Sequence, residues 1–291
     1  MFVLTRITCV VVLICSHAAS ALAQDVNIVS APEKAVNSLH ELDTAAMRLH
    51  RLHSLEAKLS SDAAELRALC RYESEISTTP PRKVLALTFD DGPEPVQTEY
   101  ILDVLKRHQI RATFFIIGDQ VKRYPDLVAK VMAEGHHLVA NHSWDHPNFH
   151  SIDVADQTLQ IKKTEQELTG SMTQKFFRYP YGNATCETND YLHKQGYKIV
   201  GWHIDSCDWA FDKTGAVDAK EAATCGVLAQ YSKNYVGHVL SAMRAHNGGI
   251  VLMHEIHPNT LKKLEEIIEL ALADGYAFDS IDAIEFVDAM R

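Results

Sequence analysis

The pattern of apolar and polar residues divides the chain into two parts. In the first part, apolar residues recur at three- and four-residue steps, which is the spacing of one face of a helix. This face consists of Leu39, Leu42, Ala46, Leu49, Leu52 and Leu55. Residues 60–62, Ser-Ser-Asp, could end that helix and cap a second one over Ala63–Tyr72. We therefore predict a helix or a helical hairpin that packs against the rest of the chain, with dimerisation or partner binding as the alternative.

From Lys83 onwards, short apolar runs alternate with amphipathic stretches. The predicted strands are Val84–Thr88, Ala112–Ile117, Leu138–Asn141, Phe176–Arg178, Tyr197–His203 and Gly249–His254. The predicted helices are Gln97–His108, Pro125–Glu134, Val154–Thr169, Thr188–Gln195, Val236–Ala245 and Leu261–Asp274. Residues 220–231 fit neither pattern clearly. The repeated strand-then-helix order predicts an α/β domain with a parallel sheet and crossover helices.

The first residues have the pattern of a targeting segment. Arg6 precedes the apolar run Ile7–Cys15, which is too short to span a bilayer, and Ala21-Leu22-Ala23 offers a small-x-small cleavage site before Gln24. We therefore predict a signal peptide over residues 1–23 and export to the periplasm or the medium. No later stretch is apolar enough for a transmembrane helix, so we expect no stable membrane insertion after the signal is removed.

The mature chain is predicted to have three segments. These are a helical region over residues 24–76, a linker over residues 77–82 and one α/β domain over residues 83–291. Pro80 and Pro81 in the linker disfavour helix and favour an extended path. With 46% hydrophobic residues, the 291-residue chain can bury one sizeable core. Its net charge of −10 argues against a nucleic-acid partner, which would usually meet a basic face.

The cysteines become informative once export is predicted. Cys70, Cys186, Cys207 and Cys225 remain after the signal peptide. In an oxidising compartment they could form two disulfides with three connectivities, or one or more could stay as buried thiols. We favour Cys207 with Cys225 and Cys70 with Cys186. None of the four belongs to a CxxC pair, so a structural zinc site is not expected.

Two groups of polar residues carry candidate chemistry. Asp90 and Asp91 directly follow an apolar strand and precede a Gly-Pro turn, and His142 and His146 lie about fifty residues further on. One carboxylate and two imidazoles are a plausible ligand set for a catalytic Zn²⁺ that keeps an open position. A short helical turn or a loop would let both imidazoles reach one ion. Taken alone, the Asp-Asp-Gly run would be a solvated turn and the histidine pair a surface feature.

Five segments in order resemble the motifs of carbohydrate esterase family 4, the polysaccharide deacetylases with the NodB-homology domain. The resemblance covers about Lys83 to Phe286 and implies a distorted, incomplete (β/α) barrel. In such a barrel the site lies at the carboxyl ends of the strands. The five segments are Leu87–Pro93, Asn141–His146, Phe177–Gly182, Asp205–Trp209 and Ile250–His254.

The resemblance also implies a role for each motif residue. Asp91, His142 and His146 would bind the metal, with Zn²⁺ expected and Co²⁺ or another divalent ion possible. Asp90 would be the general base for water, and His254 the general acid for the leaving amine. The backbone N–H of Tyr181 would stabilise the oxyanion.

Other motif residues would support these groups. Arg178 would pair with Asp90, and Asp208 would hydrogen-bond His254 and raise its pKa. Trp209 and Leu252 would form an apolar wall for the acetyl methyl group, unless they are ordinary core residues. Asn183 and Trp144 are further candidates for contacts with sugar. Glu255 stands where the family often has Asp.

The implied activity is metal-dependent hydrolysis of N-acetyl groups from N-acetylglucosamine residues of a polysaccharide, with peptidoglycan favoured. Chitin or chitooligosaccharides, poly-N-acetylglucosamine and O-acetyl esters such as acetylxylan are the alternatives. A silent carbohydrate-binding protein on the same fold is disfavoured because every key residue type is present. A peptidase or phosphodiesterase is disfavoured because no H-E-x-x-H motif occurs and a two-metal site would need more ligands.

Overall fold

The structure is a computed structural model that describes residues 70–291. Its sheet has the strand order β5-β4-β3-β2-β1-β7-β6, β8 pairs with the start of β1, and every pairing is parallel. The parallel α/β prediction is therefore confirmed. The strands are β1 Val84–Gly92, β2 Thr113–Ile116, β3 Leu138–Asn141, β4 Phe176–Phe177, β5 Lys198–Ile199, β6 Ile204–Asp205, β7 Gly249–His254 and β8 Ala277–Phe278.

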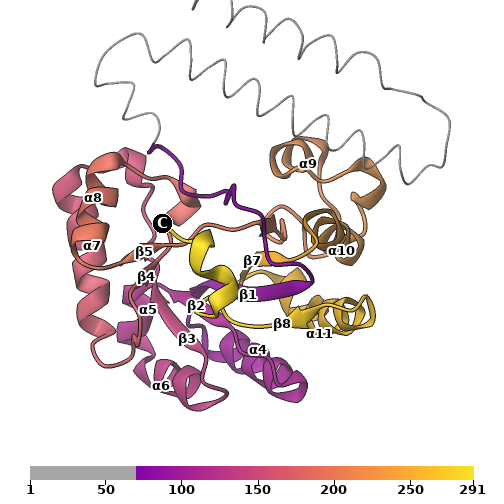
Figure 1. Cartoon of the computed structure of the whole chain (residues 1–291), viewed down its shortest axis with the longest axis horizontal. Helices are drawn as coiled ribbons and strands as arrows, with labels where there is room; N and C mark the ends of the chain where they lie inside the picture. Colours follow the sequence, from indigo (N-terminus) through magenta and orange to yellow (C-terminus); the bar gives the residue numbers. More distant parts are fainter. Residues whose placement is uncertain (1–69) are drawn as a thin grey trace, which may run out of the picture. The chain divides into compact units, whose positions relative to one another are not determined.

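Helices cover the outside of the curled sheet (Figure 1). Helix α8 contacts β5 at one edge of the sheet, and α10 contacts β6 at the other. The α-helices are α4 Pro95–His108, α5 Gly118–Arg123, α6 Pro125–Ala133, α7 Val154–Glu167, α8 Cys186–Lys194, α9 Ala219–Cys225, α10 Tyr235–His246 and α11 Pro258–Ala273. The 3₁₀ helices are η1 Phe149–Ser151, η2 Pro180–Gly182, η3 Ala229–Tyr231 and η4 Ile284–Ala289.

The two faces of β1 explain why this strand lies at the centre. Leu85, Leu87 and Phe89 point to one side and join the core under α4, α10 and α11. Ala86 points to the other side and joins a smaller core inside the curled sheet, which Phe286 of η4 also enters. A strand buried on both faces is expected to be an almost continuous apolar run, as this one is.

The prediction of one continuous strand over residues 197–203 is wrong, because the structure has no strand between Ile199 and Ile204. Only Lys198–Ile199 is extended there, and the next strand begins at Ile204. β5 pairs with β4 at one edge of the sheet and β6 pairs with β7 at the other edge. Because so few residues join the two edges, the sheet must curl until its edges approach each other. This is the incomplete barrel that the resemblance implied, with a gap between β5 and β6.

The remaining differences from the predicted elements are local. The first strand runs on to Gly92, and the motif carboxylates are therefore part of it. The short α5 and β8 have too few residues for a periodic pattern to show. Residues 220–231, which fitted no pattern, contain α9 and η3.

The chain before β1 lies on the domain in extended form. The predicted helix over Ala63–Tyr72 does not reach its predicted end, because Tyr72 forms an antiparallel bridge with Asn183. Hydrogen bonds to a distant segment replace helical hydrogen bonds here. Glu73 N–H donates to the Gly182 carbonyl at 2.9 Å, and Ala184 N–H donates to the Arg71 carbonyl at 2.9 Å. The predicted signal peptide and the rest of the predicted helical region lie outside the described residues.

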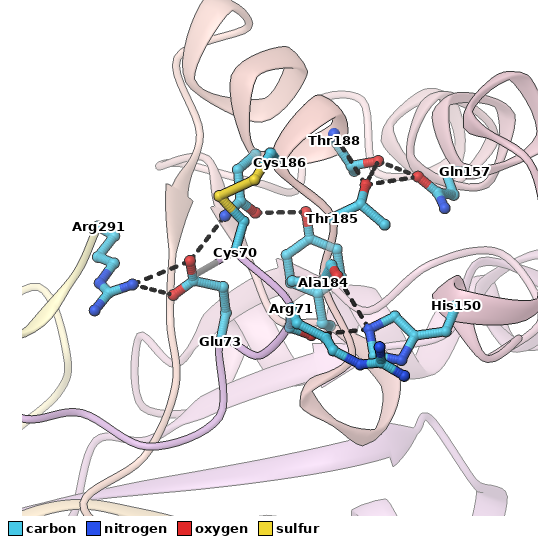
Figure 2. The surroundings of a disulfide bond; sticks show 12 residues. Cys70, Arg71, Glu73, His150, Gln157, Ala184, Thr185, Cys186, Thr188 and Arg291 are labelled. Atoms are coloured by element: carbon cyan, nitrogen blue, oxygen red, sulfur yellow. Dashed lines mark hydrogen bonds and ion pairs between the residues drawn. A yellow bond between two sulfur atoms is a disulfide. The ribbon is translucent and has the colours of Figure 1, made fainter. Parts of the chain in front are cut away.

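Both favoured cysteine pairings occur in the structure. Cys70 pairs with Cys186 at the start of α8, and Cys207 pairs with Cys225 at the end of α9. Figure 2 shows the first of these bonds beside Glu73 and Arg291. Among the described helices, none is long and apolar enough to cross a bilayer.

Candidate active site

A β-bulge at the end of β1 brings the two motif carboxylates to one place. Asp90 pairs with Phe115 and Gly92 with Ile116, so Asp91 is an extra residue with no partner in β2. Successive side chains of a regular strand point to opposite faces. Asp91 instead has φ 74°, and the bulge turns its carboxylate toward the same end of the sheet as Asp90.

The glycine after the carboxylates is required by packing. A Cβ atom at Gly92 would lie 1.9 Å from Oε1 of Glu255, which is buried. Thr98 of α4 donates a hydrogen bond to Oε2 of the same carboxyl. Burial raises the pKa of Glu255 to about 8. A larger side chain at position 92 would have to displace the buried Glu255 carboxyl.

The predicted metal ligands converge. Asp91 Oδ1 lies 3.6 Å from His142 Nε2 and 3.3 Å from His146 Nε2, and all three ligand atoms lie within 4.8 Å of one another. The histidines reach this point through a loop rather than a helical turn, since Ser143 has φ 70° and His146 has φ 60°. The loop is held by Asn141 Oδ1, which accepts from Ser143 N–H at 2.9 Å.

The donor set fits a divalent cation. Asp91 Oδ1 is buried and has no hydrogen-bond partner among the described residues. Burial lowers the pKa of His146 to about 4 and the pKa of His142 well below its usual value, so both imidazoles are neutral and can ligate. His142 Nδ1 lies 2.8 Å from the Arg178 carbonyl, which directs Nε2 at the site. Such a second bond is typical of metal-ligating histidines.

Asp90 is held by a buried arginine. Arg178 Nη1 donates to Asp90 Oδ1 at 2.8 Å and to Thr88 Oγ1 at 2.7 Å, and Arg178 is 0% exposed. The guanidinium also donates to the carbonyls of Val200 and Gly201, so it fills the gap between β5 and β6. Burial raises the pKa of Asp90 to about 6, although the charge of Arg178 opposes this rise.

His254 and Asp208 form a second pair across the site. His254 Nδ1 lies 2.7 Å from Asp208 Oδ1, and the backbone N–H of His254 donates to Oδ2 at 2.7 Å. Burial alone would lower the pKa of His254, but the charge and hydrogen bond of Asp208 raise it to about 10. Because Nδ1 is occupied, Nε2 is the atom left to face a substrate. The nearby carboxylate of Asp205 accepts from Cys207 N–H at 2.8 Å.

The turn that carries Tyr181 contacts one of the predicted metal ligands, His146. Its ring meets the His146 ring edge-on with centroids 4.6 Å apart, and the residue is 63% exposed. Its backbone has φ 57°, and the Tyr181 N–H is paired with no acceptor in the described chain. On the other side, Trp209 is 38% exposed while Leu252 is buried two residues before His254.

Comparison with known proteins agrees with this geometry. The family model described as polysaccharide deacetylase matches residues 77–200. A peptidoglycan-N-acetylglucosamine deacetylase of Bacillus cereus is 35% identical over 205 residues, which are 68% of this chain and 69% of the relative. The chain belongs to the polysaccharide deacetylase family.

Two further relatives show how far the likeness extends. The peptidoglycan-N-acetylglucosamine deacetylase PgdA of Listeria monocytogenes is 35% identical over 213 residues, 72% of this chain but 40% of the relative. The chain therefore spans about two fifths of the length of that deacetylase. The solved structure of the Bc1960 peptidoglycan N-acetylglucosamine deacetylase matches with a TM-score of 0.59 and 30% identity. The match covers 72% of this chain and 91% of that one.

Sequence reasoning missed three residues of this polysaccharide deacetylase site. Thr88 holds Arg178, and its position two residues before Asp90 could have indicated a shared strand face. Thr260 donates to Asp208 Oδ2 from α11, and no local pattern indicates that contact. Glu255 was noted only as a difference from the family, whereas it is the buried neighbour of Gly92.

Proposed function

We propose that this protein is a metal-dependent deacetylase that hydrolyses N-acetyl groups of N-acetylglucosamine residues in a polysaccharide. The observation that carries the proposal is that three groups of side chains lie together at one end of the sheet. These are a three-residue ligand set, a carboxylate paired with Arg178 and an imidazole paired with Asp208. Zn²⁺ held by Asp91, His142 and His146, or Co²⁺ in its place, would act as a Lewis acid toward the acetyl carbonyl.

The remaining steps belong to side chains and backbone of this chain. Asp90 accepts a proton from the attacking water, and Arg178 keeps the carboxylate oriented. The Tyr181 N–H donates to the carbonyl oxygen as negative charge develops there. His254 donates a proton from Nε2 to the leaving nitrogen, so that water and an amide become acetate and an amine. Trp209 and Leu252 are proposed to bound the space for the acetyl methyl group.

Peptidoglycan is the proposed substrate, because relatives that match 68% and 72% of this chain carry that activity in their names. We expect the purified protein to release acetate from peptidoglycan with an equal yield of free amines. Chitooligosaccharide, poly-N-acetylglucosamine and acetylxylan serve as the comparison panel. Acetate release from acetylxylan alone would replace the amidase assignment with an esterase, and no release from any polymer would favour a silent binding protein.

The acid role of His254 leads to a pH prediction. His254 must be protonated to act, so activity falls as pH rises through its pKa. Asp208→Asn removes the charge that raises this pKa, and the alkaline limb of kcat/KM should move to lower pH by about 1–3 units. The control is Asp205→Asn, which removes a neighbouring, half-buried carboxylate that accepts from Cys207 N–H rather than from His254, and it should move the limb less. An alkaline limb that stays in place in Asp208→Asn would disprove the coupling.

Export is proposed together with this function. Its support is the targeting pattern of residues 1–23 and the cell-wall polymer named for the relatives. The two disulfides suit an oxidising compartment. Mature protein recovered outside the cytoplasm should begin near Gln24 on N-terminal sequencing, whereas an intact Met1 would contradict export.

A further inference from the structure

The segment Cys70–Ile76, called the strap below, is fixed to the domain at several points. The Cys70–Cys186 disulfide ties its first residue to α8. Glu73 is 8% exposed and accepts from Asn189 Nδ2 at 2.8 Å and from Arg291 at 3.0 Å. Figure 2 shows the disulfide and the ion pair on the two sides of the strap. The strap lies before the residues matched by the family model, which begin at residue 77.

Two glycines let the strap lie directly on the chain that carries the site. A Cβ atom at Gly182 would lie 2.5 Å from Ser74 Cβ, and one at Gly201 would lie 2.3 Å from the Ser74 carbonyl oxygen. Gly182 directly follows Tyr181, and the Gly201 carbonyl accepts a hydrogen bond from Arg178. The strap is therefore in contact with segments that position the oxyanion donor and the base.

Tyr72 is the exposed part of this otherwise fixed segment. It is 56% exposed, although its neighbours Arg71 and Glu73 are both bonded through their backbones to the Tyr181–Ala184 stretch. His150 meets the Tyr72 ring at a centroid distance of 5.4 Å, and Nε2 of His150 also contacts the Arg71 carbonyl at 2.8 Å. The Arg71 guanidinium lies over one face of the ring at 5.8 Å from its centroid, so the ring is held in place and the rest of it remains accessible to solvent.

Unpaired amide groups lie beside this ring. Tyr72 and Asn183 form a cross-strand pair flanked by two backbone hydrogen bonds, and such partners project on the same side. Asn183 Nδ2 donates to Asn148 Oδ1 at 2.9 Å. Within residues 70–291, no protein group pairs with Asn183 Oδ1 or with Asn148 Nδ2. An acceptor and a donor are therefore free next to an accessible aromatic face.

Two residues of this surface lie close along the chain to residues of the predicted metal site and oxyanion donor. Asn148 follows His146 by two residues, and Asn183 follows Tyr181 by two residues. The Cα atoms of Tyr72 and Tyr181 consequently lie at most about 12 Å apart, since two extended residues span about 7 Å and a cross-strand pair about 4.5 Å. A polymer bound with one unit at the metal site would reach Tyr72 with a neighbouring unit.

We propose that Tyr72, Asn183 and Asn148 form a sugar-binding subsite, which the strap adds beside the catalytic centre. The inference rests on the proposed function, because the subsite would hold a neighbouring unit of the same polysaccharide. The electron-rich face of an aromatic ring attracts the C–H groups on the apolar face of a pyranose. The free amide groups match the hydroxyl and N-acetyl groups at the edge of such a ring. Polar groups set beside an aromatic surface are typical of specific ligand sites.

The test compares a β-1,4-linked N-acetylglucosamine pentamer with an aryl acetate too small to span both sites. Tyr72→Ala should raise KM for the pentamer about 3- to 10-fold and lower the ratio of pentamer to aryl acetate efficiency by a similar factor. Tyr72→Phe keeps the aromatic face and should retain the wild-type ratio. Tyr100→Ala removes an exposed tyrosine from α4 and serves as the matched control.

The outcomes separate the subsite from the proposed function. Equal losses on both substrates would mean that Tyr72 only supports the Tyr181 turn, and an unchanged pentamer KM would also overturn the subsite. Calorimetric titration of the pentamer into metal-free protein provides an arm that does not depend on catalysis. If wild type released no acetate but bound the pentamer, and Tyr72→Ala weakened that binding, the subsite would stand while the deacetylase assignment failed. Absence of binding as well as activity would overturn both.

Discussion

His142→Ala is expected to lose the bound ion and to lower kcat by more than about 10³-fold. Removing this imidazole leaves Asp91 and His146 as a two-residue set, with only one nitrogen donor. A metal ion supplies several kcal/mol of stabilisation to a developing oxyanion, and each tenfold in rate corresponds to about 1.4 kcal/mol. Elemental analysis of the purified variant gives the bound metal directly, and acetate release gives kcat.

Two further measurements keep this expectation testable if His142→Ala folds poorly. His146 is more exposed than His142, so His146→Ala removes a ligand with less disturbance of the core. Added Zn²⁺ should raise the Tm of wild type but not of either variant, because a ligand stabilises only a protein that binds it. His193→Ala, on the exposed side of α8, is the matched histidine control. Full zinc content in both ligand variants would refute the assigned site.

The motifs predicted which residues would lie close together, because these motifs lie at or just after the carboxyl ends of strands. In a parallel sheet the carboxyl ends of the strands meet at one edge. Residues at the ends of neighbouring strands must therefore lie near one another, as do Asp90, Asn141, Phe177 and His254. Their detailed geometry could not be predicted in the same way. The bulge at Asp91 and the loop between His142 and His146 depend on left-handed backbone conformations at residues other than glycine. The loop is held partly by the neighbouring Asn141 and partly by Gln160 of α7, whose Oε1 accepts from Trp144 N–H at 2.8 Å, and the second contact has no local signal.

The strap shows a second limit of reading the sequence. The second predicted helix, capped at residues 60–62 and running over Ala63–Tyr72, included the first residues of the strap. The structure instead fixes Arg71 and Glu73 to residues more than a hundred positions away. Tertiary hydrogen bonds and a disulfide override a weak local preference for helix. The crossing between β5 and β6 was misread for the same reason, since its carbonyls serve a distant arginine rather than a sheet.

Asp90→Asn is expected to lower kcat by about 10²–10⁴-fold while the metal stays bound. The substitution keeps the size of the side chain but removes the group that accepts the proton of water. The predicted metal ligands are other residues, and the amide oxygen can still accept from Arg178. Metal content and Tm, measured beside kcat on peptidoglycan, show whether the loss is catalytic. A kcat within a few fold of wild type would mean that Asp90 is not the base.

The structural cost of this substitution must be separated from the catalytic one. Loss of the Asp90 charge leaves the buried Arg178 guanidinium without its counterion, and breaking such a pair can cost about 3–5 kcal/mol of stability. Arg178 keeps its bonds to Thr88 and to the carbonyls of Val200 and Gly201, which limits that cost. Asp205→Asn provides the comparison, because burial also raises the pKa of Asp205 to about 6 but its carboxylate accepts from Cys207 N–H and not from Arg178. If both variants remain folded and only Asp90→Asn loses catalysis, the loss reflects proton transfer by Asp90 rather than the removal of a buried charge.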